Sequence, residues 1–275
     1  SSSLYMDRKY IDTLYAEIRK VPLLKSKKYT YTCMGFLLWP PVIEKITGMP
    51  YELYLKKYIY GPLGATTLTY NPYLYFPLSR IVPTEEDDYF RNEVLRGFVH
   101  DEGAAMLGGI SGNAGLFGTA NDLAKLFQMY LWKGYYGGVR FFSENIVDEF
   151  TRVQFPEKNN RRGLGFDKPY LQNREMKPGE QYPAPGVSPS SFGHSGYTGT
   201  FVWADPEKEL LFILLILVGA AISVFAAFYL REVSQALPTA TEIMAYRSSV
   251  ASVIYDRNGE TVARLFTENR QPVEL

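Results

Sequence analysis

The chain of 275 residues carries 29 Lys and Arg against 29 Asp and Glu, so no basic excess exists to neutralise phosphates, and we expect no nucleic-acid partner. Hydrophobic residues make up 46% and charged residues 21%, which is the balance of a globular protein long enough to bury a core. One cysteine excludes an internal disulfide, and two histidines argue against a histidine-based metal centre, so we expect no metal and no cofactor.

The first part of the chain predicts helices. Apolar side chains recur at helical spacing in three segments, residues 5–19, 34–47 and 51–60. Pro40 and Pro41 interrupt the second segment. Because proline lacks a backbone donor, this helix should break or kink after Trp39.

Residues 71–96 predict an acidic, loop-rich connection, and residues 103–118 are dense in glycine. Without a Gly-Lys-Ser/Thr sequence, the glycines favour a tight turn that lines a pocket over a phosphate-binding loop. His100 and Asp101 lie between these segments. Adjacent residues could form an acid–base pair, but neighbours on a loop need not face each other. We therefore interpret both residues as groups that hold the loop by hydrogen bonds.

The second half predicts capped helices and then strands. Thr119 is typical of a helix N-cap, with the carboxylate of Asp122 three residues on, before an apolar stripe of helical period. Ser143 repeats this design as the cap of a helix that ends near residue 150. Two strands follow, joined by a turn at residues 205–208, and they cover Thr200–Ala204 and Leu210–Leu215.

The last part of the chain differs from the rest. No charged residue occurs from 210 to 230. As a helix, this run would be long enough to cross roughly 30 Å of hydrocarbon. Beyond it, Asn258-Gly259 lies between two strand-like segments, which predicts a hairpin over residues 252–255 and 261–266.

Six motifs occur in one order along the first two hundred residues. They include Tyr31-Thr32-Cys33 before a predicted helix and His194-Ser195-Gly196 on a predicted strand, and they cover residues 31–36, 43–48, 99–109, 114–124, 162–167 and 192–200. In these stretches the chain resembles the class C β-lactamase and penicillin-binding-protein-related serine hydrolases, in the variety attached to bacterial N-acetylglucosaminidases. The resemblance implies an α/β (α+β) fold for residues 1–215, with helices packed on an antiparallel sheet.

Such enzymes use three elements: Ser-x-x-Lys, Tyr-x-Asn and a Lys/His-x-Gly strand. The resemblance implies that Tyr31 is the general base and that His194 is its catalytic companion on the strand. The implied substrate-binding residues are Cys33, which stands where Asn or Asp is usual, Asn113, which stands where His is usual, Ser195, Gly196 and Tyr197.

Plainer interpretations stay open for three of these residues. Tyr31 is also compatible with ordinary tyrosine packing, and His194 with a structural histidine. Cys33 is also typical of a small buried apolar residue, because a thiol cannot replace the paired donor and acceptor of an amide.

The nucleophile motif is absent from the sequence. No serine has a lysine three positions later. Ser26 comes closest to the motif, but its lysines are Lys27 and Lys28 and the third position is Tyr29. Without Ser-x-x-Lys the mechanism lacks its nucleophile and primary base, so we expect the chain as given to be inert in acyl transfer.

The end of the chain resembles a second family, the N-terminal membrane region of class A penicillin-binding proteins. The resemblance rests on Leu237-Pro238, Ser252–Glu260 and Leu265–Leu275. It implies three parts: the partial hydrolase domain, residues 1–215; a hydrophobic helix, residues 216–232; and a polar tail similar to the entry of a glycosyltransferase domain, residues 233–275.

The resemblances imply a fragment, inactive as given, of a hydrolase for β-lactam, ester or peptidoglycan-peptide substrates. They place it on a bacterial membrane, at the periplasmic or extracytoplasmic face. The expected partners are a peptidoglycan peptide or a β-lactam-like small molecule, with the membrane as a further candidate. Two alternatives stay open. One is a membrane-anchored, non-catalytic module that binds the cell wall, and the other is a non-functional chimera, since the two resemblances place the chain on opposite sides of a membrane.

Overall fold

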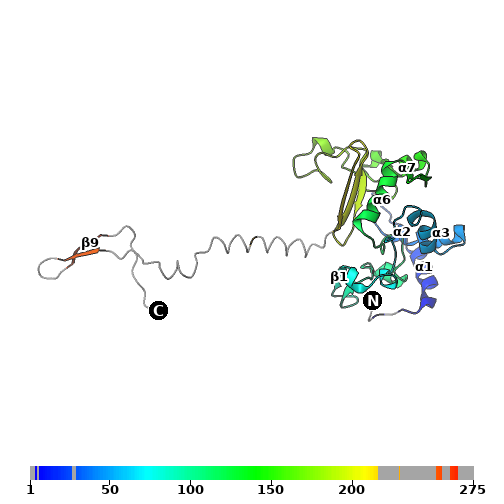
Figure 1. The fold of residues 1–275 in the computed structure, drawn as a ribbon, viewed down its shortest axis with the longest axis horizontal. Helices are drawn as coiled ribbons and strands as arrows, with labels where there is room; N and C mark the ends of the chain where they lie inside the picture. The colour runs from blue at the N-terminus through cyan, green and yellow to red at the C-terminus, as the bar shows by residue number, and fades with distance from the viewer. Residues whose placement is uncertain are drawn as a thin grey trace. The chain divides into compact units, whose positions relative to one another are not determined.

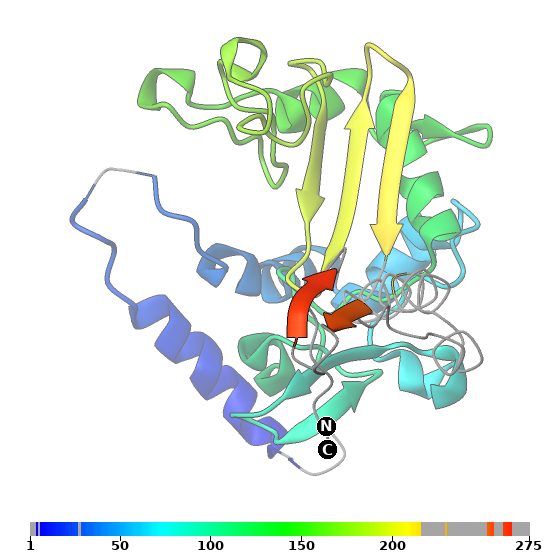
Figure 2. The same ribbon diagram turned by 90° about the vertical axis from the view of Figure 1, so that its left-hand side faces the viewer.

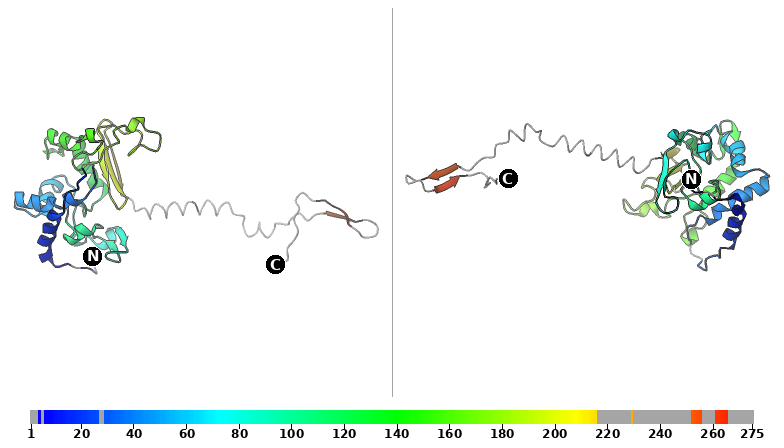
Figure 3. Two further views of the ribbon diagram at one scale, coloured as in Figure 1. Left: turned by 180° about the vertical axis from the view of Figure 1, so that it is seen from behind. Right: turned by 90° about the horizontal axis from the view of Figure 1, so that it is seen from below.

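The structure is a computed structural model that describes residues 4, 6–26, 29–215 and 229, together with the backbone of strands 252–255 and 261–265. The chain divides into two compact units, residues 1–217 and 218–275 (Figure 1, Figure 3). In the part that the structure describes, no helix has both the length and the apolar character needed to cross a membrane. The predicted hydrophobic helix, apart from residue 229, lies outside the described residues.

The first unit begins with short helices where three longer ones were predicted. They are η1 (Arg8–Tyr10), α1 (Ile11–Lys20), α2 (Met34–Leu37), α3 (Trp39–Thr47), α4 (Tyr51–Leu55) and the π-helical turn η2 (Lys56–Tyr60). The predicted break in the second helix exists, but its place was wrong: it falls at Leu38, before Trp39. Pro40 lies in the first turn of α3, where backbone N–H groups have no partner within the helix, so proline is tolerated there.

The segment predicted as loop-rich contains a hairpin, which corrects that prediction. After the short 3-10 turns η3 (Pro72–Leu74) and η4 (Leu78–Arg80), strand β1 (Pro83–Asp87) pairs antiparallel with β2 (Glu93–Arg96). These strands carry mostly charged or exposed side chains, and only Leu95 and Asp87 are buried. The alternation of apolar and polar residues that signals a strand is therefore missing.

Helix α6 (Ala120–Leu131) begins as predicted. Thr119 is its N-cap, and the Thr119 hydroxyl accepts a hydrogen bond from the backbone N–H of Asp122 at 3.3 Å. Ser143 occupies the N-cap of α7 (Glu144–Thr151), but its hydroxyl makes no capping hydrogen bond, so the predicted side-chain cap was wrong there. The remaining elements of this region are α5 (Glu102–Met106), η5 (Pro156–Lys158), η6 (Asn173–Glu175) and the two-residue strands β3 (Tyr135–Tyr136) and β4 (Val139–Arg140).

The main sheet has three antiparallel strands in the order β5 (Phe192–Ser195), β6 (Thr200–Asp205) and β7 (Leu210–Leu215), side by side in Figure 2. The strands at 200–204 and 210–215 were predicted with their bounds, whereas β5 was expected only as the strand that carries His194. One face packs on α6, where Phe127 contacts Phe192 and Ala204.

The opposite face of the sheet is aromatic. Phe201 stacks on Trp203 with ring centroids 5.6 Å apart, and Phe212 packs edge-on against Phe201 at 6.1 Å. Trp203 is buried, whereas Leu210 and Phe212 on β7 are 56% and 52% exposed. The first unit is thus a mixed α/β structure whose sheet has one covered face and one partly open face.

The second unit contains the predicted hairpin. Strand β8 (Ser252–Tyr255) pairs antiparallel with β9 (Thr261–Leu265), which confirms the two strands. The predicted Asn258-Gly259 turn lies outside the described residues.

Candidate active site

The segment that precedes α2 contributes Tyr31 and Cys33. The hydroxyl of Thr32 accepts a hydrogen bond from the backbone N–H of Met34 at 3.2 Å and so starts the helix. Cys33 is half-buried at the N-cap position, while Tyr31 is 55% exposed. The segment before α2 therefore leaves the tyrosine ring largely exposed rather than packed in the core.

Strand β5 contributes His194 at its end. Gly193, the residue before it, leaves no room for a side chain, because an added Cβ would overlap the carbonyl oxygen of Val202 and lie 2.6 Å from the Trp203 ring. The chain then turns, and the backbone N–H of Gly196 donates to the carbonyl oxygen of Thr200 at 2.7 Å. The end of β5 is thus held tightly on β6, which fixes the position of His194.

Tyr31 and His194 come together, with ring centroids 6.4 Å apart. Arg162 joins them. Its Nη1 lies 2.9 Å from Nε2 of His194, and its Cζ lies 5.0 Å from the centre of the Tyr31 ring. Three segments that are distant in sequence therefore meet in one cluster of tyrosine, histidine and arginine.

Arg162 was missed as a site residue. It is the first residue of the motif at 162–167 that was noted in the sequence, but an arginine beside a second arginine gives no local signal for a role. Its place between Tyr31 and His194 depends on contacts across the fold.

The hydrogen bonds of His194 select one tautomer of its ring. Nδ1 lies 2.7 Å from the carbonyl oxygen of Ser195, which can only accept, so Nδ1 carries the proton and donates. Nε2 then accepts the hydrogen bond from the Arg162 guanidinium, which can only donate. These two contacts fit the Nδ1–H tautomer, in which Nε2 is already occupied as an acceptor.

We expect a two-bond ¹H–¹⁵N correlation spectrum at neutral pH to show His194 as the Nδ1–H tautomer. The chain has two histidines, so a His194→Gln variant assigns the signal by elimination. In Arg162→Met the Nε2 resonance should move, because its donor is lost, while the Nδ1 resonance should stay in place. A spectrum of the Nε2–H tautomer in the unmodified chain would contradict the arrangement.

The phenol of Tyr31 is protonated at neutral pH. Burial raises the pKa of Tyr31 above its ordinary value of 10, the nearby Cys33 raises it further, and the Arg162 guanidinium opposes the increase only in part. Tyr31 can therefore donate a hydrogen bond to a ligand.

The other predicted site residues divide into two groups. Ser195 and Gly196 are exposed where β5 ends, next to His194. Asn113 accepts a hydrogen bond from the Ser111 hydroxyl at 2.6 Å. Among the described residues, no hydrogen bond or ion pair joins Asn113 to Tyr31 or His194.

Tyr197 is 81% exposed on the turn after β5, and one face of its ring is covered by His100. The two rings are nearly parallel, 8° apart, with centroids separated by 5.0 Å. No pattern of residues in the sequence indicated this pairing. It connects the turn beside His194 to the segment that precedes α5.

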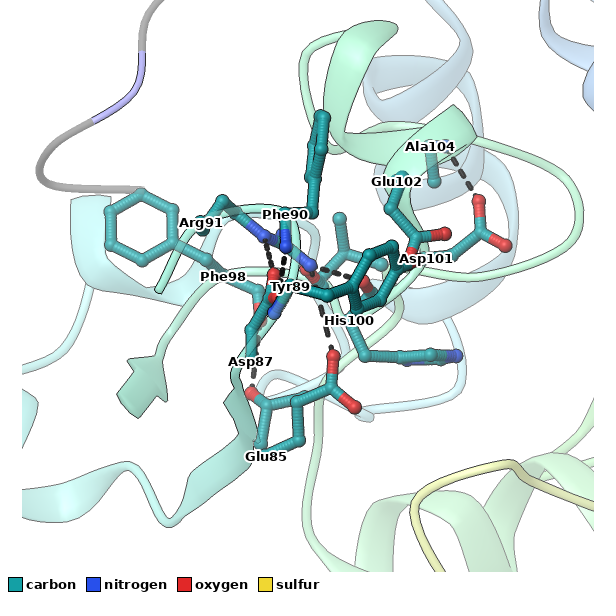
Figure 4. A network of polar contacts seen from close by, with 12 residues as sticks. Glu85, Asp87, Tyr89, Phe90, Arg91, Phe98, His100, Asp101, Glu102 and Ala104 are labelled. Atoms are coloured by element: carbon teal, nitrogen blue, oxygen red, sulfur yellow. Dashed lines mark hydrogen bonds and ion pairs between the residues drawn. The ribbon is translucent and has the colours of Figure 1, made fainter. Parts of the chain in front are cut away.

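A buried ion pair holds that segment in place (Figure 4). Arg91 Nε lies 2.5 Å from the Asp87 carboxylate, and each side chain is 1% exposed. The same guanidinium donates to the carbonyl oxygens of Val99 and His100. Asp101 accepts a hydrogen bond from the backbone N–H of Ala104 at 2.7 Å, so its predicted hydrogen bond exists, although it caps the helix α5. The same prediction was wrong for the His100 side chain, which stacks on Tyr197 and makes no hydrogen bond to a described residue.

Comparisons with known proteins agree on one family. The model of the family described as Beta-lactamase matches residues 3–218. A protein of Salmonella paratyphi B named "Putative D-alanyl-D-alanine carboxypeptidase" is 35% identical over 214 residues, which cover 72% of this chain and 48% of that protein. The chain therefore spans about half the length of the curated relatives that it matches.

Two solved structures share the fold. The octameric penicillin-binding protein homologue from Pyrococcus abyssi aligns with a TM-score of 0.52 at 20% identity and covers 75% of this chain and 43% of its own. The penicillin binding protein from Bacillus halodurans aligns with a TM-score of 0.51 at 14% identity and covers 78% of this chain and 62% of its own.

Proposed function

This chain belongs to the beta-lactamase family, and we propose that its first unit binds D-alanine-terminated peptides or β-lactams at the cluster of Tyr31, Arg162 and His194 without forming a covalent product. The observation that carries the proposal is the convergence of these three side chains, with 6.4 Å between the Tyr31 and His194 rings and Arg162 in contact with both. The name of the Salmonella relative supports the peptide class.

The outer edge of β5 supports the binding of an acyl group. Gly193 uses this edge to exchange backbone hydrogen bonds with Asp167, at 2.8 and 3.0 Å. Hydrogen-bonding directions alternate along a strand, so the N–H of Ser195, two residues on, points to the same side. A ligand carbonyl placed beside β5 would accept from this N–H, which is the interaction that stabilises an oxyanion in acyl transfer.

The same residues do not supply a nucleophile. No Ser-x-x-Lys motif occurs in the 275 residues, and the phenol of Tyr31 is protonated. Nε2 of His194 is occupied by Arg162. We propose that ligands bind to this chain reversibly and that acyl transfer requires a serine and lysine that this chain does not provide.

Two measurements on the purified chain test the proposal. Nitrocefin hydrolysis should stay at the buffer rate, and fluorescent penicillin should leave no label after denaturation. Titration calorimetry with N-acetyl-D-alanyl-D-alanine should still show binding, which His194→Ala removes. Arg152→Gln changes an exposed arginine that pairs with Glu149 on the surface, so it serves as the control and should bind normally.

Two results would contradict the proposal. Label that survives denaturation would show that another nucleophile reacts, and a Cys33→Ser variant would then identify or exclude the thiol. Absence of peptide binding to a chain that melts cooperatively would show that the cluster is not a ligand site.

A further inference from the structure

A small surface pocket lies outside the site described above, between α4, η2 and the segment that follows them. Two of its lining side chains, Tyr60 and Leu68, are buried members of the hydrophobic core. Three others, Glu52, Lys56 and Tyr75, reach solvent. The pocket has room for a methyl group or a water molecule rather than for a whole ring.

Hydrogen bonds hold the walls of this pocket, to which Thr69 and Tyr70 also belong. The Tyr70 hydroxyl donates to the carbonyl oxygen of Ser111 at 3.0 Å, and the Thr69 hydroxyl donates to the carbonyl oxygen of Tyr70 at 3.0 Å. The backbone of Thr69 exchanges hydrogen bonds with Phe117, at 3.0 and 2.9 Å. The pocket is therefore preformed, and a ligand does not have to order its walls.

Two charged side chains at the pocket do not pair with each other. Glu52 and Lys56 are four residues apart, the spacing at which opposite charges on a helix usually meet. Helix α4 ends before Lys56, and the backbone widens into the π-helical η2, where the Lys56 carbonyl oxygen accepts from the N–H of Gly61 at 2.9 Å. The Lys56 ammonium lies over the Tyr75 ring instead, 4.4 Å from its centre. Among the described residues, neither the Glu52 carboxylate nor the Lys56 ammonium has a hydrogen-bond or ion-pair partner.

We propose that this pocket binds the acetamido group of an N-acetylated sugar. The N–H of that group donates to the Glu52 carboxylate, and its carbonyl oxygen accepts from the Lys56 ammonium. Its methyl group has the size that the pocket holds. The sugar ring stays outside and packs its C–H side on the ring of Tyr75, which is 47% exposed. One ligand thus supplies a partner for each charged group that the chain leaves without one.

Two other occupants predict different affinities. A water molecule that fills a gap in the packing would leave this surface indifferent to sugars. A cation held by the Tyr75 ring and the Glu52 carboxylate would favour an amino sugar over its acetylated form, but the Lys56 ammonium already lies over that ring and repels a second positive charge. The three occupants therefore differ in their response to the group at C2 of the sugar.

The experiment compares the β-1,4-linked trimers of N-acetylglucosamine, glucosamine and glucose, which differ only at C2, by NMR titration of the full chain. The acetylated trimer should bind at least about tenfold more tightly than the glucose trimer, since a hydrogen bond to a charged group has a typical net value near one decade of affinity. Glu52→Gln should lose most of this preference, because a neutral amide oxygen is a weaker acceptor than a carboxylate. Its affinity for the glucose trimer should stay the same.

Two tyrosines provide a matched pair of variants. Tyr75→Ala should weaken both the acetylated and the glucose trimer, because packing on its ring does not depend on C2. Tyr58 is also 47% exposed and also has a lysine over its ring, with Lys57 Nζ 5.0 Å from the centre, but it does not line the pocket. Tyr58→Ala should therefore bind all three trimers as the unmodified chain does.

Four results overturn the proposal. Equal affinities of the acetylated and glucose trimers, or no binding of either, would show that the pocket does not recognise the acetamido group. Equal weakening of both trimers by Glu52→Gln would remove the carboxylate from that role. Tighter binding of the glucosamine trimer would assign the pocket to a cation. Equal losses in Tyr75→Ala and Tyr58→Ala would place the sugar elsewhere. The peptide binding proposed above is tested separately, because no residue of its cluster lines this pocket.

Discussion

Replacement of Arg91 by methionine should lower the free energy of unfolding by about 3–5 kcal/mol. The guanidinium is 1% exposed. Its removal leaves the buried Asp87 carboxylate without its cation and the carbonyl oxygens of Val99 and His100 without their donor. An uncompensated buried charge is among the largest penalties that one substitution can introduce. Urea unfolding followed by circular dichroism measures the change.

Arg96→Met is the matched control. Arg96 lies on β2, close to Arg91 in sequence, but it is exposed, and such surface changes stay within about 0.5 kcal/mol. If both variants lose the same small amount of stability, the buried pair does not form. The ring signals of Tyr197 should also change in Arg91→Met, since its stacking partner His100 is held by Arg91.

The same ion pair predicts how stability depends on pH. Burial by itself would raise the pKa of Asp87, but the Arg91 guanidinium and the backbone N–H groups of Phe90, Arg91 and Tyr89 lower it to about 2, from 3.8 in the unfolded chain. A folded-state pKa below the unfolded value means that the stabilisation is complete above about pH 4 and disappears as the pH falls to 2. Arg91→Met should flatten this part of the stability profile.

Gly193→Ala should lower the free energy of unfolding by about 3 kcal/mol and abolish ligand binding. The new Cβ would overlap the carbonyl oxygen of Val202 and approach the Cα of Trp203 to 2.8 Å, and both are backbone atoms that cannot rotate away. Strand β5 would have to separate from β6. His194 would then move with β5 and lose its distance to Arg162 and Tyr31. Thermal unfolding and peptide calorimetry measure the two effects.

Gly35→Ala is the control for the same chemical change. Gly35 lies inside α2 with no atom within 4 Å of an added Cβ. Alanine is a better helix former than glycine, so this variant should gain up to about 1 kcal/mol. A small effect of both substitutions would show that β5 does not pack on β6 as closely as the structure has it.

Features that depend on neighbours in sequence were predictable. The Thr119 cap, the strands at 200–205 and 210–215, and the hairpin of the second unit each leave a local pattern of residue types. The hairpin of β1 and β2 leaves none, because its buried polar contact joins Asp87, the last residue of β1, to Arg91 in the connection that follows, and apolar alternation is missing.

The candidate site was predictable only in part. Tyr31 and His194 were found through a family resemblance, and their spacing in the chain says nothing about their contact. Arg162 and the stack of His100 on Tyr197 were missed, since each depends on rings and donors brought together by distant segments. The hydrogen bond of Asp101 was predictable because its donor, the backbone N–H of Ala104, is only three residues away in sequence.

The open face of the main sheet affects how this protein behaves at high concentration. Leu210 and Phe212 on β7 expose apolar side chains in a row, and β7 is an outer strand of the sheet. Water gains entropy when such a strip is covered, and an outer strand offers unpaired backbone groups to whatever covers it. We therefore expect this strip to promote contacts between copies of the chain at high concentration, and dilution to weaken them.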